Sequence, residues 1–349
     1  MRELSDKEIM PVAPDTISDF TLRWNLPSWI DNLVENLQVI RSGRDIIDLP
    51  KKEKEPCVVV GAGPSLKYFN HLEMIRKSGW SHPVLSCDKV LSECLRHQIV
   101  PYATATVDGS PAIHGFYTAG IVKKYAPKVN ALFSVLVHPS VAKTYGGYGG
   151  PIYWYVPLLD MPVTPDKKLD VRSLSYILSL LTKHQSLVSG IGNVGAFLWN
   201  VAYELGSDPI ILVGFDFSEQ VRDKADAVYF EKFTAMFLQK SKDPDAAQDK
   251  AAALHQLESN PDFIAEKTGE GWLKAYYTKG QPVRYLVNPV WKHYRRVFAQ
   301  HIVTSKRHTI QATGNGCLHT KAKDDEGNYI LKADNFEAMD LKDVLEKYK

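Results

Sequence analysis

The chain has 349 residues, of which 44% are hydrophobic and 23% charged, so disorder as the main state is excluded. Lys and Arg number 42 and Asp and Glu 40, and the formal charge of +2 gives no global field that would favour nucleic acid. No apolar run approaches 18 residues, and the four cysteines include no C-x-x-C pair. We therefore expect one large or two modest domains with no membrane span and no nucleic-acid partner. The N-terminus has no apolar signal region, which favours a cytoplasmic location.

The first 55 residues are predicted to form an N-terminal helical segment. Its apolar residues recur at the spacing of one helix face: Trp29, Ile30, Leu33, Leu37 and Ile40. The charged stretch 51–56 reads as a solvated linker between this segment and the rest of the chain.

Residues 56–220 carry short apolar runs that alternate with helical patterns. Strands are predicted over residues 57–60, 83–87, 102–107, 131–137 and 209–213. Helices are expected after residue 66, over 90–97 and over 193–205, where Gly206 is a typical stop. Such alternation predicts an α/β fold with a mostly parallel sheet and helices on both faces, whose ligands bind at the carboxyl ends of the strands.

The remaining residues change in character twice. Residues 221–300 are charged and rich in Ala, Lys and Asp, which predicts a helical insertion or cap with helices near 228–239 and 246–257. Residues 301–349 are expected to complete the core with a last strand, a glycine turn near 312–316 and a final amphipathic helix.

The strongest chemical signal is a glycine turn that follows the first predicted strand of the core and opens a helix. It consists of Gly61, Ala62, Gly63, Pro64 and Ser65. Such a turn aims backbone N–H groups and the positive end of a helix at one point, where a phosphate is the natural guest. Proline suits the first turn of a helix, and the serine hydroxyl would add a donor. The pattern is neither G-x-G-x-x-G nor a P-loop, so a phosphate site and a purely structural turn both stay open.

A second glycine-rich turn, residues 189–195, enters the helix predicted over 193–205. Ser189 and Gly190 would add an anion or sugar contact, and Asn193 would either cap the helix or bind a ligand. The alternative is close packing of Gly192 and Gly195 against a neighbouring strand.

Acidic residues follow three of the predicted strands: Asp88, Asp108 and Asp216. Acids at such positions hold Mg²⁺ or accept hydrogen bonds from a ribose. Asp108 is the best candidate for metal or phosphate chemistry, but Asp-Gly-Ser-Pro also favours an Asx turn. Asp88 would equally serve as a helix N-cap. His138 ends a strand-like run and is either a general base or a satisfied, half-buried histidine.

Two further segments allow two interpretations each. Residues 145–151 (Tyr-Gly-Gly-Tyr-Gly-Gly-Pro) are either a lid with aromatic contacts or a plain flexible connection, and we favour the connection. Residues 292–296 (Lys-His-Tyr-Arg-Arg) either bind phosphate or acidic partners or form a solvated helix face, which is the default.

Residues 61–66, 189–195 and 210–218 together resemble a known superfamily. It groups the archaeal 6-hydroxymethyl-dihydropterin diphosphokinase-like (MptE-like) proteins with the bacterial motility accessory factor glycosyltransferases. More distantly the chain is similar to bacterial sialyltransferases, which share a G-x-G-P-S-L turn. The resemblance covers about residues 56–218 and resumes near 311–316. It implies a Rossmann-like nucleotide-binding core and a transferase that uses a nucleotide donor.

The resemblance also implies roles by position. Gly61, Gly63, Pro64 and Ser65 would contact the donor phosphates, and Asp216 would close the site. Ser189, Gly190 and Asn193 would line the nucleotide. Asp88 stands where the sialyltransferases place an asparagine that touches the nucleotide. Asp108 is a single acid where the pterin diphosphokinases carry an acid-rich segment for Mg²⁺ and ATP, a departure that lowers the diphosphokinase interpretation.

Three functions follow as hypotheses. The first is a glycosyltransferase with a nucleotide-activated donor, of the nonulosonic or sialic-acid type that uses a CMP-sugar, in which Asp108 or His138 activates the acceptor hydroxyl. The second is an ATP- and Mg²⁺-dependent diphosphotransferase of the 6-hydroxymethylpterin type, with Asp108 and Asp216 on the metal. The third is a non-catalytic nucleotide-binding protein. The acceptor (glycan, protein or pterin) and the oligomeric state stay open.

Overall fold

The computed structural model describes residues 16–160, 166, 168–184, 187–188, 192–220, 272–276, 282–286, 289–314, 316–318, 322–323 and 331–349. The backbone forms two compact units, each made of two separate stretches of chain. Unit 1 comprises Met1–Leu49 and Ala103–Gly190, and unit 2 comprises Pro50–Tyr102 and Ile191–Lys349. This division differs from the four consecutive segments predicted above (1–55, 56–220, 221–300 and 301–349), which stay a prediction.

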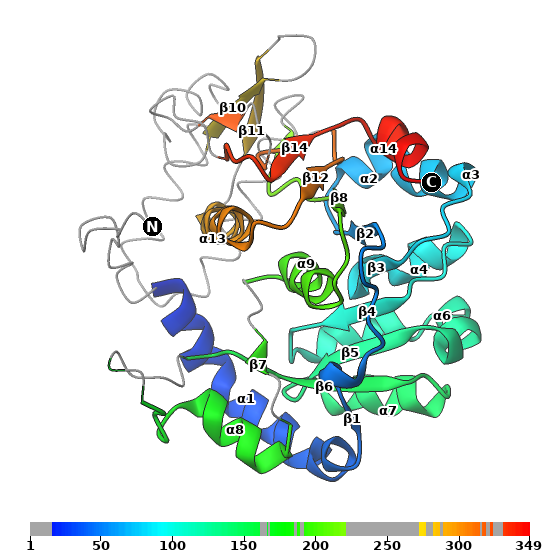
Figure 1. Cartoon of the computed structure of the whole chain (residues 1–349). Helices are drawn as coiled ribbons and strands as arrows, with labels where there is room; N and C mark the ends of the chain where they lie inside the picture. Colours follow the sequence, from blue (N-terminus) through cyan, green and yellow to red (C-terminus); the bar gives the residue numbers. More distant parts are fainter. Residues whose placement is uncertain are drawn as a thin grey trace, which may run out of the picture. The chain divides into compact units, whose positions relative to one another are not determined.

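Unit 1 is built on a parallel sheet. Its strands lie in the order β1 (Arg44–Asp45), β6 (Ile152–Pro157), β5 (Asn130–Ser134) and β4 (Ala103–Thr106), and β7 (Leu187–Val188) pairs with β6. Its principal helices are α1 (Thr16–Arg41), α5 (His114–Tyr117), α6 (Gly120–Tyr125), α7 (Pro139–Gly147) and α8 (Leu174–Thr182). Figure 1 shows α6 and α7 on one face of this sheet and α1 and α8 on the other.

Unit 2 has a second run of parallel strands. The order is β3 (Val84–Cys87), β2 (Cys57–Val60), β8 (Ile210–Val213), β12 (Thr309–Gln311) and β14 (Phe336–Ala338). Its helices are α2 (Ser65–Tyr68), α3 (His71–Ser78), α4 (Asp88–Arg96), α9 (Val194–Glu204), α13 (Pro289–Ser305) and α14 (Leu341–Lys347). Helices α9 and α13 cover one face, and α3, α4 and α14 cover the other (Figure 1).

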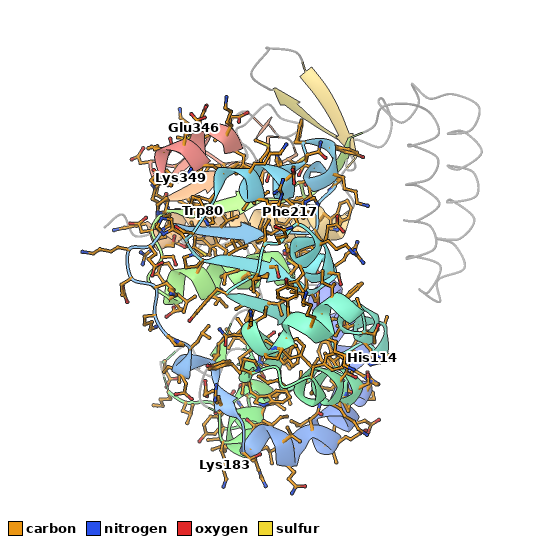
Figure 2. All side chains as sticks on the ribbon, turned by 90° about the vertical axis from the view of Figure 1, so that its right-hand side faces the viewer. Trp80, His114, Lys183, Phe217, Glu346 and Lys349 are labelled. Carbon is orange, nitrogen blue, oxygen red and sulfur yellow. The ribbon has the colours of Figure 1, made fainter. Side chains whose placement is uncertain are left out.

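Burial explains why the strands of unit 2 are apolar throughout. Every residue of β2, β3 and β8 is buried, as expected for parallel strands covered by helices on both faces. On one face, Trp199 of α9 packs edge-on against Phe298 of α13, with ring centroids 5.7 Å apart. On the other, α14 packs against α3, and its end, marked by Glu346 and Lys349 in Figure 2, brings Lys349 beside Gly79. These contacts fix the sheet that carries the candidate site.

The structure confirms the α/β, Rossmann-like fold and the principal predicted elements. The strands expected over 57–60, 83–87, 102–107, 131–137 and 209–213 are β2, β3, β4, β5 and β8. Helix α9 ends at Glu204, and Gly206, two residues later, has a φ of +84°, the left-handed conformation that favours glycine after a helix. Helices α1 and α14 lie where the apolar periodicity places them.

Two sequence interpretations need correction. Residue Tyr145 belongs neither to a lid nor to a flexible connection, because it is fully buried within α7 and its hydroxyl donates to the carbonyl of Val129 over 2.7 Å. Within the predicted helical insertion, the structure describes two strands, β10 (Trp272–Tyr276) and β11 (Pro282–Leu286), which pair antiparallel. The helices expected near 228–239 and 246–257 lie outside the described residues. No helix in the described part of the chain is both long and apolar enough to cross a membrane.

Candidate functional site

The strand order of unit 2 reverses direction at one point. From β2 the chain proceeds to its neighbour β3, whereas β8, on the other side of β2, is followed in the sheet by β12. In open parallel sheets, ligands bind outside the carboxyl ends of the strands at such a switch point. The predicted turn Gly61–Ser65 leaves β2, and Gly214–Asp216 leaves β8, so both segments lie at this position.

The turns after β2 and β8 interlock through their backbones. The amides of Gly61 and Gly63 donate to the carbonyls of Val213 and Gly214, over 2.8 and 2.9 Å. A β-carbon at Gly61 would lie 2.5 Å from the Gly214 carbonyl oxygen, and Gly214 itself has a φ of +74°. Glycine is therefore required at both positions, because the backbones of the two turns approach each other closely. Because these two amides already have acceptors, they are not the donors of a phosphate site.

Two other amides of the same turn have no acceptor within the described protein. They belong to Ala62, at the exposed tip, and to Ser65, the first residue of α2. Pro64, which directly precedes Ser65, has φ −64° and ψ −26°, which is already the helical conformation. The turn therefore offers two donors and the start of a helix at the carboxyl edge of the sheet, which is the arrangement that favours an anion.

Ser65 and Asp216 connect the two turns through their side chains. The Ser65 hydroxyl, which is fully buried, donates to Oδ2 of Asp216 over 2.7 Å. A side chain at Gly63 would collide with the same carboxylate. The Ser65 hydroxyl, predicted to donate to a phosphate, thus donates to Asp216 in this structure. Asp216 is 3% exposed and is covered by the turn.

Two side chains from the C-terminal part of the chain form hydrogen bonds with the β8 turn. The Phe215 amide donates to Oγ1 of Thr313 over 3.0 Å, and Nε2 of Gln311 donates to the Phe215 carbonyl over 3.3 Å. Both polar residues are buried. They were not predicted as site residues, although two buried polar side chains directly at the end of an apolar strand are the signal that identifies them.

Helix α13 contributes Arg295, which lies in the cationic run 292–296 that was predicted to face solvent. Arg295 is only 5% exposed, so the solvated-face interpretation is wrong for this residue, although Arg296 is exposed. Burial raises the pKa of the nearby Cys317 thiol to about 11, an effect partly offset by the positive charge of Arg295. A thiol with so high a pKa stays protonated at neutral pH and is a poor nucleophile.

Asn193 begins α9 beside the same turns. Its Oδ1 accepts from the Ala196 amide over 3.0 Å, which is the predicted helix cap. Its Nδ2 is shielded from solvent, and no acceptor for it lies among the described residues. Gly195, the second residue of the helix, packs against Phe215, since an added β-carbon would lie 3.1 Å from that ring, and Gly192 lies against Tyr294 of α13. The predicted cap is therefore present, and both glycines are closely packed, although against the β8 turn and a helix and not against a strand.

Three further candidates are Asp88 of unit 2 and Ser189 and Gly190 of unit 1. Asp88 is buried at the first turn of α4, where its Oδ1 accepts from the Lys89 amide over 2.7 Å. Asp88 is the first residue of α4 and Cys87 is the N-cap, so the predicted N-cap position is wrong by one residue. Ser189 and Gly190 lie outside the described residues, so their roles stay predictions.

Asp108 and His138 belong to unit 1. Asp108 is exposed, and its Oδ1 accepts from the Ser110 amide over 2.8 Å in the Asx turn that the sequence allowed. His138 caps α7: its Nδ1 lies 2.8 Å from Oγ of Ser140 and accepts from the Ser140 amide at 3.3 Å. An Nδ1 that accepts an amide proton places the ring proton on Nε2, so His138 presents a donor rather than a base in this conformation.

The described residues contain no group of three or more His, Cys, Asp and Glu side chains arranged to hold a metal ion. A magnesium ion bound with a nucleotide needs only one or two carboxylates, because phosphate oxygens and water complete its shell. Asp216 is the acid of unit 2 that lies beside the candidate phosphate turn. Its use by Mg²⁺, and that of Asp108, stay predictions.

Comparisons with known proteins find similarity to a protein family and to a solved structure. A family model described as "6-hydroxymethylpterin diphosphokinase MptE-like" matches residues 29–222, which is more than half of the chain. No curated protein matches significantly. The structure is similar to that of a MAf glycosyltransferase from Magnetospirillum magneticum AMB-1, with a TM-score of 0.50 and 13% sequence identity. The similarity covers 95% of this chain but only 42% of that protein, so it extends to the fold alone. Since the family model spans both the β2 turn and the β8 turn, the chain belongs to the MptE-like family.

Proposed function

We propose that this protein is a glycosyltransferase that uses a nucleotide-activated sugar, whose phosphate is held by the turn after β2. The observation that carries the proposal is the pair of Ala62 and Ser65 amides, which lack a protein acceptor in the described structure and stand at the switch point of a parallel sheet. The similarity in fold to a glycosyltransferase supports the reaction class. The donor is proposed to be of the CMP type, as the resemblance to sialyltransferases implies.

The chemistry requires charge stabilisation on the leaving group. When the acceptor hydroxyl attacks the anomeric carbon, the bond to the phosphate oxygen breaks and negative charge grows on the nucleotide. Fixed amide donors and a helix terminus stabilise that charge without reorganising. The buried amide of Asn193 would donate to the nucleotide at the same edge. Asp108 is proposed as the base that takes the acceptor proton, because Nδ1 of His138 is already used to accept the Ser140 amide.

A thermal-shift panel tests the donor class. The protein is melted with CMP, CDP, UDP, AMP and ATP, each with and without Mg²⁺, because a ligand that binds the folded state raises Tm. We expect CMP to give the largest increase without metal. A panel in which no nucleotide changes Tm would contradict the proposal.

A diphosphotransferase is the second candidate, and the description of the matching family favours it. In that reaction the acceptor oxygen attacks the β-phosphorus of ATP and AMP departs, with Mg²⁺ neutralising the phosphates. Asp216 would be the acid nearest to that metal, since it contacts the turn through Ser65. A Tm increase that requires both ATP and Mg²⁺ would replace the first proposal by this one.

A further inference from the structure

Helix α1 reaches the carboxyl ends of β4 and β5 through two buried asparagines. Asn32 is 6% exposed and Asn36 is 4% exposed. They lie four residues apart and therefore on one face of the helix. Both side chains are directed at backbone carbonyls of the loops that leave these neighbouring, parallel strands.

The amide of Asn32 ties the two loops together. Its Nδ2 donates one hydrogen to the Gly109 carbonyl over 2.9 Å and the other to the Leu136 carbonyl over 3.0 Å. A side-chain amide nitrogen has two hydrogens, so its donor capacity is fully used. Gly109 also allows the close approach, because a β-carbon there would lie 2.6 Å from both the Leu136 oxygen and the ring of Trp29.

Asn36 secures the second loop alone. Its Nδ2 donates to the Val137 carbonyl over 2.8 Å. Asp108 directly precedes Gly109, and His138 directly follows Val137, so two of the three anchored carbonyls belong to residues next to a predicted site residue. A shift of either loop would therefore move one of these side chains.

We propose that Asn32 and Asn36 are positioning residues, which make helix α1 part of the site by fixing the loops of Asp108 and His138. The step from loop position to catalysis rests on the proposed function, whereas the anchoring of the loops does not. The amide is essential to the role. A carboxylate at position 32 would face two carbonyl oxygens, and an aliphatic side chain would leave both of them buried without a donor.

Hydrogen exchange followed by mass spectrometry tests the anchoring without a substrate. Asn32→Ala is expected to raise exchange at least fivefold both in residues 108–112 and in residues 135–138. Asn36→Ala, which removes a single bond, is expected to do so only in residues 135–138. The matched control is Gln38→Ala, an exposed position on the same helix. Unchanged exchange in both loops of folded Asn36→Ala and Asn32→Ala would overturn the proposal, as would a rise spread evenly over unit 1.

A kinetic measurement tests the functional step. Hydrolysis of CMP-N-acetylneuraminate is followed for the wild type, Asn32→Ala, Asp108→Asn and the double variant. We expect Asn32→Ala to lower kcat at least tenfold with KM for the donor within twofold, and the double variant to be no slower than Asp108→Asn alone. If Asn32 had a purely structural role, the losses of kcat in the two single variants would multiply in the double variant. That result would refute the proposed effect of Asn32 on catalysis. If the wild type hydrolyses no donor, the proposed function fails, and hydrogen exchange alone decides the anchoring.

Discussion

Replacing Ser65 by alanine tests the connection between the two turns most simply. The hydroxyl is fully buried and donates to a carboxylate that is 3% exposed, over 2.7 Å. Hydrogen bonds to charged groups contribute about 1.5–3 kcal/mol, and loss of this one leaves Oδ2 of Asp216 without that donor. We therefore expect Ser65→Ala to lower the free energy of unfolding by about 2 kcal/mol and Tm by about 3 °C.

Urea denaturation followed by tryptophan fluorescence measures this difference, with Ser42→Ala as the control. The Ser42 hydroxyl is exposed, directly follows α1 and donates to the Gln38 and Val39 carbonyls of its last turn, so its removal is expected to change stability by less than about 0.5 kcal/mol. Equal stability of Ser65→Ala and the wild type would refute the reasoning, because the buried bond would then contribute nothing.

Three further predictions concern unit 2. Burial lowers the pKa of His71 from 6.5 to about 4, so the neutral form is favoured in the folded state. The free energy of unfolding therefore decreases as the pH falls from 6.5 to 4, by at most about 3 kcal/mol. In acid denaturation curves, His71→Gln should show a smaller decrease. Gly63→Ala would crowd the Asp216 carboxylate and is expected to lower stability by about 1–3 kcal/mol in urea, whereas the open Gly115→Ala should not. Asn193→Ser keeps a capping oxygen but removes the buried amide, so Tm should change by less than about 2 °C while calorimetry shows weaker nucleotide binding.

The sequence was most informative where one physical signal dominated. Continuous apolar runs predicted β2 and β8, because strands buried on both faces must be apolar along their whole length. A glycine turn after such a strand located the switch point. The strand β6 was missed, since Ile152–Pro157 begins and ends beside prolines and follows a glycine-rich segment that obscured it.

The hydrogen-bond partners of the glycine turns could not be predicted from the sequence of each turn alone. The sequence left a phosphate site and a structural turn open for Gly61 and Gly63, and the structure uses the amides of both for contact with the β8 turn, about 150 residues later. Arg295 was also predicted wrongly. Its cationic neighbours suggested a solvent-exposed helix face, but tertiary packing buries its side chain. Contacts between segments far apart in the sequence decide these roles, and the periodicity within one segment does not predict such contacts.

The central claim is that the tip of the β2 turn binds the phosphate of a nucleotide, and charge at Ala62 tests it directly. Ala62 is exposed, so Ala62→Asp and the neutral, equally large Ala62→Asn should both fold normally. A carboxylate about 5 Å from a phosphate costs on the order of 1–2 kcal/mol, or about tenfold in Kd. Calorimetric titration with the nucleotide that raises Tm most is expected to show this loss for Ala62→Asp and less than threefold for Ala62→Asn. Equal affinity of the two variants would contradict a phosphate at this turn.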